Sequence, residues 1–519
     1  MLSQRTIAQN NLMELAPGAE KLLFNKETGE HRLIGNIHIT FQSNTIYCDS
    51  ASYFEKASLL KMYGNVHLKK RDTLNLYCDS LHYDSKTRIA KMWGNVRIRD
   101  REYKITTDSL DFDTKNEVAI YRNGGRVESS LRKETLQSKS GYFYPKSKNI
   151  TVSGNVLFKN ESTTLISDSL RYQFISKKVF FFGATKIIRS DKTKISAKKG
   201  WYKMDTEEAV FQDNASISKE NQFISGDSLY MHETKGISIG KGNVYYSDDQ
   251  KGSAFRGNTF YSSKKNNKSY LTGKAVIEYK LKSDTIFIHA DTLFTFTDST
   301  NQISQVKGYY NARFFSTKTQ GICDSLIYNR NQGILEMFSK PIIWSNKAEL
   351  KGEKINIYLN DSIVQRAEIQ TKATVITEVE VSKLYNQVGG KYIIAYFDSE
   401  NELKKIDVNG NAQTIYYPEE TIKKDSLIEI QRKGMSRLYS SDIKIYVENN
   451  EFTKVVYVDQ ADGVFYPIEK INKEEQFIAG YNWNPTLRPA TKIDIFPKTE
   501  AKPKSKIKPI LKGKKGKHR

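Results

Sequence analysis

"GNVHLKKRDTLNLYCDSLHYD", residues 64–84, repeats the pattern of "GNIHITFQSNTIYCDSASYF", residues 35–54. Both stretches open on Gly-Asn, alternate apolar and polar residues, and reach Cys-Asp-Ser before an aromatic residue. Self-similarity at a fixed period is typical of repeat architectures. The Gly-Asn landmark, or a degenerate version of it, recurs at intervals of 29, 30, 30, 30 and 29 residues, at Gly35, Gly64, Gly94, Gly124, Gly154 and Gly183.

A second landmark keeps the same period. Asp-Ser or Asp-Thr before an apolar residue occurs at Asp49, Asp79, Asp108, Asp168, Asp227, Asp291 and Asp324. Beyond Gly273 the period loosens, with late versions at Gly308 and Gly410. About a dozen repeats therefore occupy residues 30–420.

Within a repeat, apolar residues alternate with polar ones, which predicts half-buried β-strands. Gly-Asn tolerates a positive φ and predicts a turn before a strand. Asp-Ser can bond to its own following backbone, so it predicts the end of a strand. Each repeat is thus expected to form about four short strands with corners, and repeats that cannot bury their apolar face alone must stack. The predicted fold is an all-β, elongated, solenoid-like repeat body or jellyroll.

The net charge of +22 allows two interpretations, solvated strand faces or attraction to an anionic partner. Nine of the basic residues lie in the last 19 residues, and removing them from +22 leaves +13 for the first 500. Solvated strand faces rich in Lys account for a mild excess. The other reading is attraction to an anionic partner, for which a membrane surface or a phosphorylated glycolipid is favoured over nucleic acid, because no nucleic-acid-binding motif is present.

The three cysteines, Cys48, Cys78 and Cys323, all fall just before an Asp-Ser. Stacked free thiols are the expected state, with a Cys48–Cys78 bridge as the open alternative. No stretch is apolar and long enough to span a bilayer. The first 25 residues show no signal peptide, so the chain reads either as cytosolic or as beginning after a removed signal.

The sequence contains few candidates for catalytic residues. The ladder of Asp49, Asp79, Asp108 and Asp168 could bind calcium or cleave a glycosidic bond. It recurs in every repeat, however, so corner residues that accept backbone N–H groups are the favoured interpretation. The seven histidines do not show metal-ligand spacing, and no phosphate-binding loop or nucleophile elbow is present. The sequence predicts no catalytic residue, metal site or cofactor, and no enzyme.

The stretches "LAPGAEKLLFNKETGEHRLIGNIHI", "RIAKMWGNVRI", "YRNGGRV" and "SGYFY", and later "MFSKPIIWSNKAELKGEKINIYLND" and "VNGNAQTIYY", resemble the OstA-like family of Gram-negative bacteria in its long Bacteroidetes form. The resemblance covers roughly residues 15–490. It implies a V-shaped, mostly antiparallel, two-sheet β-jellyroll that serves as a periplasmic bridge, or as the periplasmic part of the outer-membrane translocon, for lipopolysaccharide. Acyl chains are then expected against the apolar interior, with sugars and phosphates at the open edge.

The expected function is a non-enzymatic lipid carrier or bridge in lipopolysaccharide transport and outer-membrane assembly. The expected partners are lipopolysaccharide or a related glycolipid, other transport components and copies of the chain itself end to end, without nucleic acid. The expected location is the periplasm, including the periplasmic face of the outer membrane. A structural solenoid such as a surface adhesin is the alternative, and a polysaccharide-active enzyme is the third reading. A cluster of Asp, Arg or Lys that breaks the repeat in a cleft would favour the enzyme.

The inward parity of the repeats predicts the lining of a lipid groove, where each buried methylene contributes about 0.8 kcal/mol. The predicted lining is Ile37, Ile39, Ile46, Val66, Leu68, Leu74, Leu76, Val96, Ile98, Ile105, Val156 and Leu165. The alternative is that these residues form a closed, dry core.

Five segments are expected. They are a lead segment (1–20), an OstA-like jellyroll with 30-residue repeats (21–275), a less regular OstA-like β region (276–420), a C-terminal β cap or accessory module (421–497) and a basic disordered tail (498–519).

Overall fold

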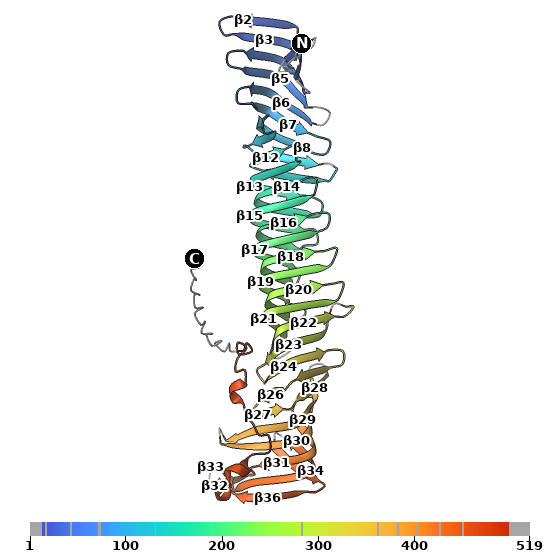
Figure 1. Ribbon diagram of the computed structural model, residues 1–519, viewed down its shortest axis with the longest axis vertical. Coiled ribbons are helices and arrows are strands. Elements are labelled where there is room, and N and C mark those ends of the chain that lie inside the picture. Colours follow the sequence, from blue (N-terminus) through green and yellow to red (C-terminus); the bar gives the residue numbers. More distant parts are fainter. Residues whose placement is uncertain are drawn as a thin grey trace, which may run out of the picture. The chain divides into compact units, whose positions relative to one another are not determined.

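The computed structural model in Figure 1 describes residues 13–15, 18–41, 44–70, 74–129, 131–281, 284–300, 302–360, 363–380, 383–400, 402–424, 427–448 and 451–497. The chain forms two compact units. Unit 1 is Met1–Lys280 with Thr292–Val306, and unit 2 is Leu281–Asp291 with Lys307–Arg519. The predicted basic tail and most of the predicted lead segment lie outside the described residues, and the predicted domain boundaries stay predictions.

Unit 1 contains β1 Met13–Leu15, β2 Lys21–Asn25, β3 Glu30–Phe41, β4 Asn44–Phe54, β5 Leu59–Lys70, β6 Leu74–Asp84, β7 Ile89–Arg99, β8 Lys104–Asp113, β9 Val118–Tyr121, β10 Gly125–Ser129, β11 Glu134–Ser138, β12 Ser140–Tyr144, β13 Asn149–Lys159, β14 Thr163–Gln173, β15 Lys178–Arg189, β16 Lys194–Lys203, β17 Glu208–Lys219, β18 Gln222–His232, β19 Ile237–Asp248, β20 Ser253–Ser263 and β21 Lys268–Lys280. The next two strands, β22 Thr285–Thr297 and β23 Ile303–Phe315, contribute residues to both units.

Unit 2 continues with β24 Thr319–Asn329, β25 Ile334–Phe338, β26 Ile342–Ser345, β27 Ala348–Lys351, β28 Lys354–Asn360, β29 Ile363–Glu380, β30 Leu384–Phe397, β31 Leu403–Tyr416, β32 Glu419–Lys424, β33 Leu427–Arg432, β34 Gly434–Glu448, β35 Glu451–Val458 and β36 Asp462–Pro467. Three short 3-10 helices follow, at Ile468–Lys470, Lys473–Gln476 and Pro485–Leu487.

A typical repeat of unit 1 is a pair of long antiparallel strands, each bent near its middle. β5 pairs with β6 over nearly its whole length, with one shift of register between Tyr63 and Val66. At this bulge Gly64 has a φ of 75° and Asn65 a φ of 44°, both in the left-handed region. Gly and Asn enter that region more readily than other residues, and a bulge bends a strand and increases its twist. The strand therefore continues through the corner.

The prediction of four short strands per repeat is wrong for most of unit 1, because Gly-Asn and Asp-Ser lie in bulges within continuous strands. Four short strands do occur at one level of unit 1, at β9 to β12. There β8 pairs with β9 over one part of its length and with β10 over another. In the same way β13 pairs with β11 and with β12.

The bends divide each long strand into two halves, which we assign to two sheets. Sheet 1 contains the halves joined by the tight turns at residues 55–58, 85–88, 114–117, 145–148, 174–177, 204–207, 233–236 and 264–267. Sheet 2 contains the other halves. We call the line of bends the spine, the strand ends away from the spine the two rims, and the opening between the rims the mouth. Figure 1 shows the strands of unit 1 stacked one after another in chain order.

The core of unit 1 lies between the two sheets. One contiguous cluster of buried apolar side chains runs from Ile37 to Leu229. The apolar residue after Asp-Ser always faces inward in this unit, as at Leu81, Leu110 and Leu170. Alternation along both halves of each strand therefore produces a single interior.

In unit 2, residues 477–497, here called the C-terminal strap, cross several strands. Ile478 N donates to Gln387 Oε1 of β30 at 3.0 Å, and Asn484 N donates to Glu349 Oε2 of β27 at 3.1 Å. Arg488 Nε then donates to Gln320 Oε1 of β24 at 2.7 Å. These three partners on the strands are buried polar side chains, and the strap satisfies them.

The all-β, mostly antiparallel jellyroll predicted from the sequence is confirmed. Cys48, Cys78 and Cys323 are free and buried, so the expectation of free thiols is also confirmed. Within the described residues, no helix has the length and apolar character needed to cross a membrane.

Candidate functional site

The predicted groove residues all lie on sheet 2 and face the interior. Eleven of them are buried, and Leu68 is partly buried and packs against the same core. Val66 pairs with Cys78 and Leu68 pairs with Leu76, so the set forms ladders across successive strands. The structure thus brings these residues together in one interior, which side chains fill.

The prediction missed the facing wall, which sheet 1 provides. Its buried residues include Leu60, Met62, Leu81, Met92, Leu110, Val152, Leu170, Val179 and Phe181. The sequence contains a signal for this wall, because each Asp-Ser is followed by an apolar residue that starts a second inward series. The bulge adds one residue to the alternation in strands such as β6, so the inward side chain after Cys78 is Leu81, three residues later.

The predicted corner carboxylates link neighbouring strands at the spine. Asn95 Nδ2 donates to Asp79 Oδ2 at 2.9 Å, and Ala184 N donates to Asp168 Oδ2 at 2.8 Å. The side-chain contact recurs at Asp49 with Asn65 and at Asp227 with Asn243. The donor at most of these corners is an Asn side chain, where the sequence suggested backbone N–H groups. These Asp residues are therefore structural links of the repeat.

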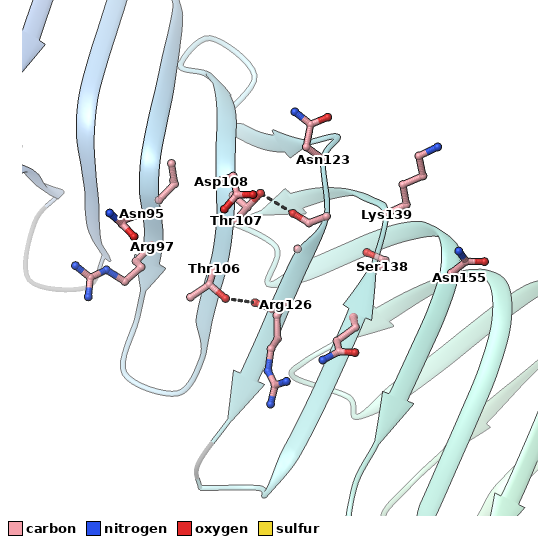
Figure 2. A pocket seen from close by; sticks show the side chains of 14 residues that line it. Asn95, Arg97, Thr106, Thr107, Asp108, Asn123, Arg126, Ser138, Lys139 and Asn155 are labelled. Atoms are coloured by element: carbon pink, nitrogen blue, oxygen red, sulfur yellow. Dashed lines mark hydrogen bonds between the residues drawn. The ribbon is translucent and has the colours of Figure 1, made fainter.

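A polar notch of about 730 Å³ lies on the spine where the strands are split (Figure 2). Lys139 stands there in the slot that Asp occupies at other corners, facing Gly154. Asp108 makes no side-chain hydrogen bond to the described part of the chain, while its neighbour Thr107 donates to Gly124 O at 2.6 Å. Arg97 and Arg126 complete the charged lining.

The notch is a cluster of Asp, Arg and Lys that interrupts the repeat. Such a cluster in a cleft would favour a polysaccharide-active enzyme. Its lining holds one carboxylate and no His or Cys. Glycoside hydrolysis requires two carboxyl groups about 5–10 Å apart. The notch therefore lacks the acid–base pair of that chemistry.

Histidines of the first repeats stack with aromatic residues on the outer face of sheet 2. The rings of His38 and Tyr47 are 4.6 Å apart, and those of His67 and Tyr77 are 4.3 Å apart. No group of three or more His, Cys, Asp or Glu that could hold a metal ion occurs among the described residues. These rings act in cross-strand stacking.

A buried polar cluster at the mouth was not predicted. Glu134 accepts hydrogen bonds from the hydroxyls of Tyr103 and Tyr172, each 2.9 Å from Oε1. Burial raises the pKa of Glu134, and the two tyrosine donors oppose this shift. Glu134 takes the inward position that Leu74 fills two repeats earlier on sheet 2. The sequence could have revealed this cluster, because an acidic residue there falls at a position that the alternating pattern directs inward.

Two family models match the chain. Residues 18–157 and 148–227 match the model described as OstA-like protein. Residues 194–363 match the model described as LptA/(LptD N-terminal domain) LPS transport protein. Together the two matches support the resemblance to the OstA-like family over residues 18–363. The matched residues include the groove set, the notch and the Glu134 cluster.

Among solved structures, the chain is similar to LptH of Pseudomonas aeruginosa, described as the LptA homologous periplasmic component of the conserved lipopolysaccharide transport device. The two are 18% identical over 22% of this chain and 81% of that chain, with a TM-score of 0.20. No curated protein matches the chain.

Proposed function

We propose that this chain is a periplasmic lipid carrier or bridge in lipopolysaccharide transport, and that unit 1 holds acyl chains between its two sheets. The observation that carries the proposal is the continuous apolar interior from β3 to β18. The family matches support the transport role.

The repeat provides a path without gaps. Strands of a sheet lie about 4.8 Å apart, so inward side chains follow one another at that spacing. Along sheet 2, Ile39, Ile46, Leu68, Leu76 and Ile98 are paired in register from strand to strand. An acyl chain that moves along this line exchanges one apolar neighbour for the next and stays shielded from water.

Acyl chains can enter this interior only if the sheets separate. Val156 and Ile150 have no exposed surface, so side chains occupy the space at present. The spine joins the two sheets covalently, whereas the rims are joined by side chains. Separation of the rims at the mouth therefore costs the least free energy, because it breaks no backbone hydrogen bonds between strands.

The role does not require catalysis. The corner carboxylates are held by cross-strand bonds, and the notch lacks a pair of carboxyl groups. We therefore propose a binding and transfer function, with lipopolysaccharide or a related glycolipid as the cargo and other transport components as partners.

The test is a lipid-binding comparison. Protein purified without detergent is extracted with organic solvent, and mass spectrometry should detect lipopolysaccharide in the extract. Leu68→Asp places a charge on the inner face near the rim of sheet 2, where the side chain is only partly buried. Lys69→Asp is the matched control, because it places the same side chain on the outer face of the same strand.

Leu68→Asp should lower binding at least tenfold, because a charge facing hydrocarbon is strongly disfavoured. Lys69→Asp should bind like the parent protein. If both variants bind equally well with unchanged melting curves, the interior is not the lipid site. If Leu68→Asp unfolds the protein, the interior behaves as a closed core.

A further inference from the structure

The mouth of unit 1 closes progressively along the chain. Inward aromatic side chains near the rim of sheet 1 occupy equivalent positions on alternate strands, linked through the register at Tyr53, Tyr83, Phe112, Phe143, Tyr172 and Tyr202. Tyr53 is 38% exposed, whereas Tyr172 is 1% exposed. Two tyrosines at equivalent positions of this series thus differ in environment: Tyr53 faces water, and Tyr172, four members later, faces a sealed interior.

The sealing is done by a cluster that joins the two rims. Tyr103 and Glu134 belong to the rim of sheet 2, and Tyr172 and Phe174 belong to the rim of sheet 1. Both tyrosines donate to Glu134 Oε1, and the rings of Tyr103 and Phe174 lie 3.9 Å apart. Arg132 Nη1 donates to the backbone O of Phe174 at 2.9 Å. We call these five residues the rim clasp.

A second tie follows on the next repeats. Arg189, at the sheet 2 rim, donates to Glu207 Oε1 at 2.9 Å and to Glu233 Oε2 at 2.6 Å. Both acids lie in tight turns of the sheet 1 rim. We call these three residues the arginine tie. Each contact in the rim clasp and the arginine tie involves at least one side chain and none joins two backbone groups, so the rims can part without loss of strand pairing.

The spine is weakened at the same level as the rim clasp. Residues 122–124 link β9 to β10, and Lys139 alone separates β11 from β12, so the strands there are not continuous between the sheets (Figure 2). The ring of Tyr121 fills the split, in a space that Gly125 and Gly141 leave open. Short linkers absorb rotation more easily than paired strands do. A hinge thus lies opposite the rim clasp.

We propose that the rim clasp and the arginine tie form a gate in the lipid path of unit 1, with the split spine as its hinge. This inference rests on the proposed function. In the closed state, the first repeats expose inward aromatic side chains such as Tyr53 at the mouth, where acyl chains can first bind, and the Glu134 cluster bars the interior at residues 103–174. Passage to the later repeats requires the rims to part, because a carboxyl group held between two hydroxyls obstructs hydrocarbon sterically and by its polarity.

The experiment measures the mouth directly. Nitroxide labels at Leu131→Cys and Ile175→Cys, which are 76% and 74% exposed on opposite rims, report the distance between the rims by double electron–electron resonance. The native thiols are buried and leave the background low. The gate variant is Arg132→Ala with Arg189→Ala, and the matched control is Arg132→Lys with Arg189→Lys. The ligand is BODIPY-labelled lipopolysaccharide.

The labelled parent should show one short distance that lengthens when the lipopolysaccharide is added. The gate variant should show the longer distance without ligand and should take up the lipid at least tenfold faster, while the Lys control stays near the parent. If the gate variant does not fold, Glu207→Ala with Glu233→Ala, which removes both acceptors of Arg189 and changes only turn residues, replaces it with the same expectation.

Two results overturn the inference in distinguishable ways. Lipid binding with a fixed rim distance in all proteins rejects the gate and leaves the proposed function intact. Absence of lipid binding in the parent and in every variant rejects the proposed function, and the gate with it.

Discussion

Nη1 of Arg189 lies 2.6 Å from Oε2 of Glu233, and this contact joins the two rims of unit 1 across 44 residues of sequence. The guanidinium is mostly buried, so the contact is stronger than an exposed ion pair. Arg189→Ala should lower the free energy of unfolding by about 2 kcal/mol, because hydrogen bonds to two charged partners are lost. Urea denaturation measures this change. Lys133→Ala, which removes an exposed ion pair with Glu161, is the control and should leave the urea midpoint nearly unchanged.

The second prediction concerns the pH dependence of stability at Glu134. Its pKa is raised above the ordinary value of 4.5 by burial, opposed by hydrogen bonds from Tyr103 and Tyr172 and by the charge of Arg132. A raised pKa stabilises the fold while the group is protonated, and this contribution is lost as the pH rises through the folded-state pKa. Glu134→Gln keeps an acceptor for the tyrosines and does not titrate. Its stability relative to the parent should therefore increase from about pH 4 upward, as measured by chemical denaturation at several pH values. A constant difference across that range would contradict the prediction.

The third prediction compares two corners of the spine. Asp79→Ala removes the acceptor of Asn95 Nδ2 and should lower the free energy of unfolding by about 1 kcal/mol. Asp108→Ala should cost less, because Asp108 makes no comparable bond within the described residues. Thermal melts of the two variants side by side give the comparison. Equal losses would show that the corner carboxylates act through something other than this bond.

The fourth prediction concerns the C-terminal strap. A chain ending at residue 475 loses the contacts to Gln387, Glu349 and Gln320, which leaves three buried polar groups without these partners. The melting temperature should fall by several degrees, and backbone amides of β24, β27 and β30 should exchange faster with deuterium. A chain ending at residue 500 is the control, since the removed composition of Lys, Pro and Gly has almost nothing to bury. A large drop for the control would show that the basic tail docks on the folded chain.

The fifth prediction concerns the thiols. Burial, with a smaller contribution from the adjacent Asp, raises the pKa of Cys48 and of Cys78 to about 12. Because the thiolate is the reactive form, the native protein should react very slowly with Ellman's reagent at pH 8. The protein in guanidinium should react with all three cysteines at once. Rapid modification of the native protein would show that the core opens readily.

Much of the fold follows from local patterns. The 30-residue period, the alternation around Val66 and Leu76, and the glycines at the bends are properties of short stretches, and they predicted an all-β repeat with an apolar interior. The same reasoning placed the cysteines as buried free thiols. It failed on strand length, because a bulge at Gly64 and Asn65 bends a strand without ending it.

The sequence by itself determined the repeat, the strand class, the inward parity and the family resemblance, because each of these depends on residues close together in the chain. Only the tertiary structure decided which rims meet and which side chains meet there. Glu134 finds its partners 31 and 38 residues away, and Arg189 finds one of its acids 44 residues away. Such contacts depend on how successive bends close the two sheets upon each other, and no local pattern specifies that angle.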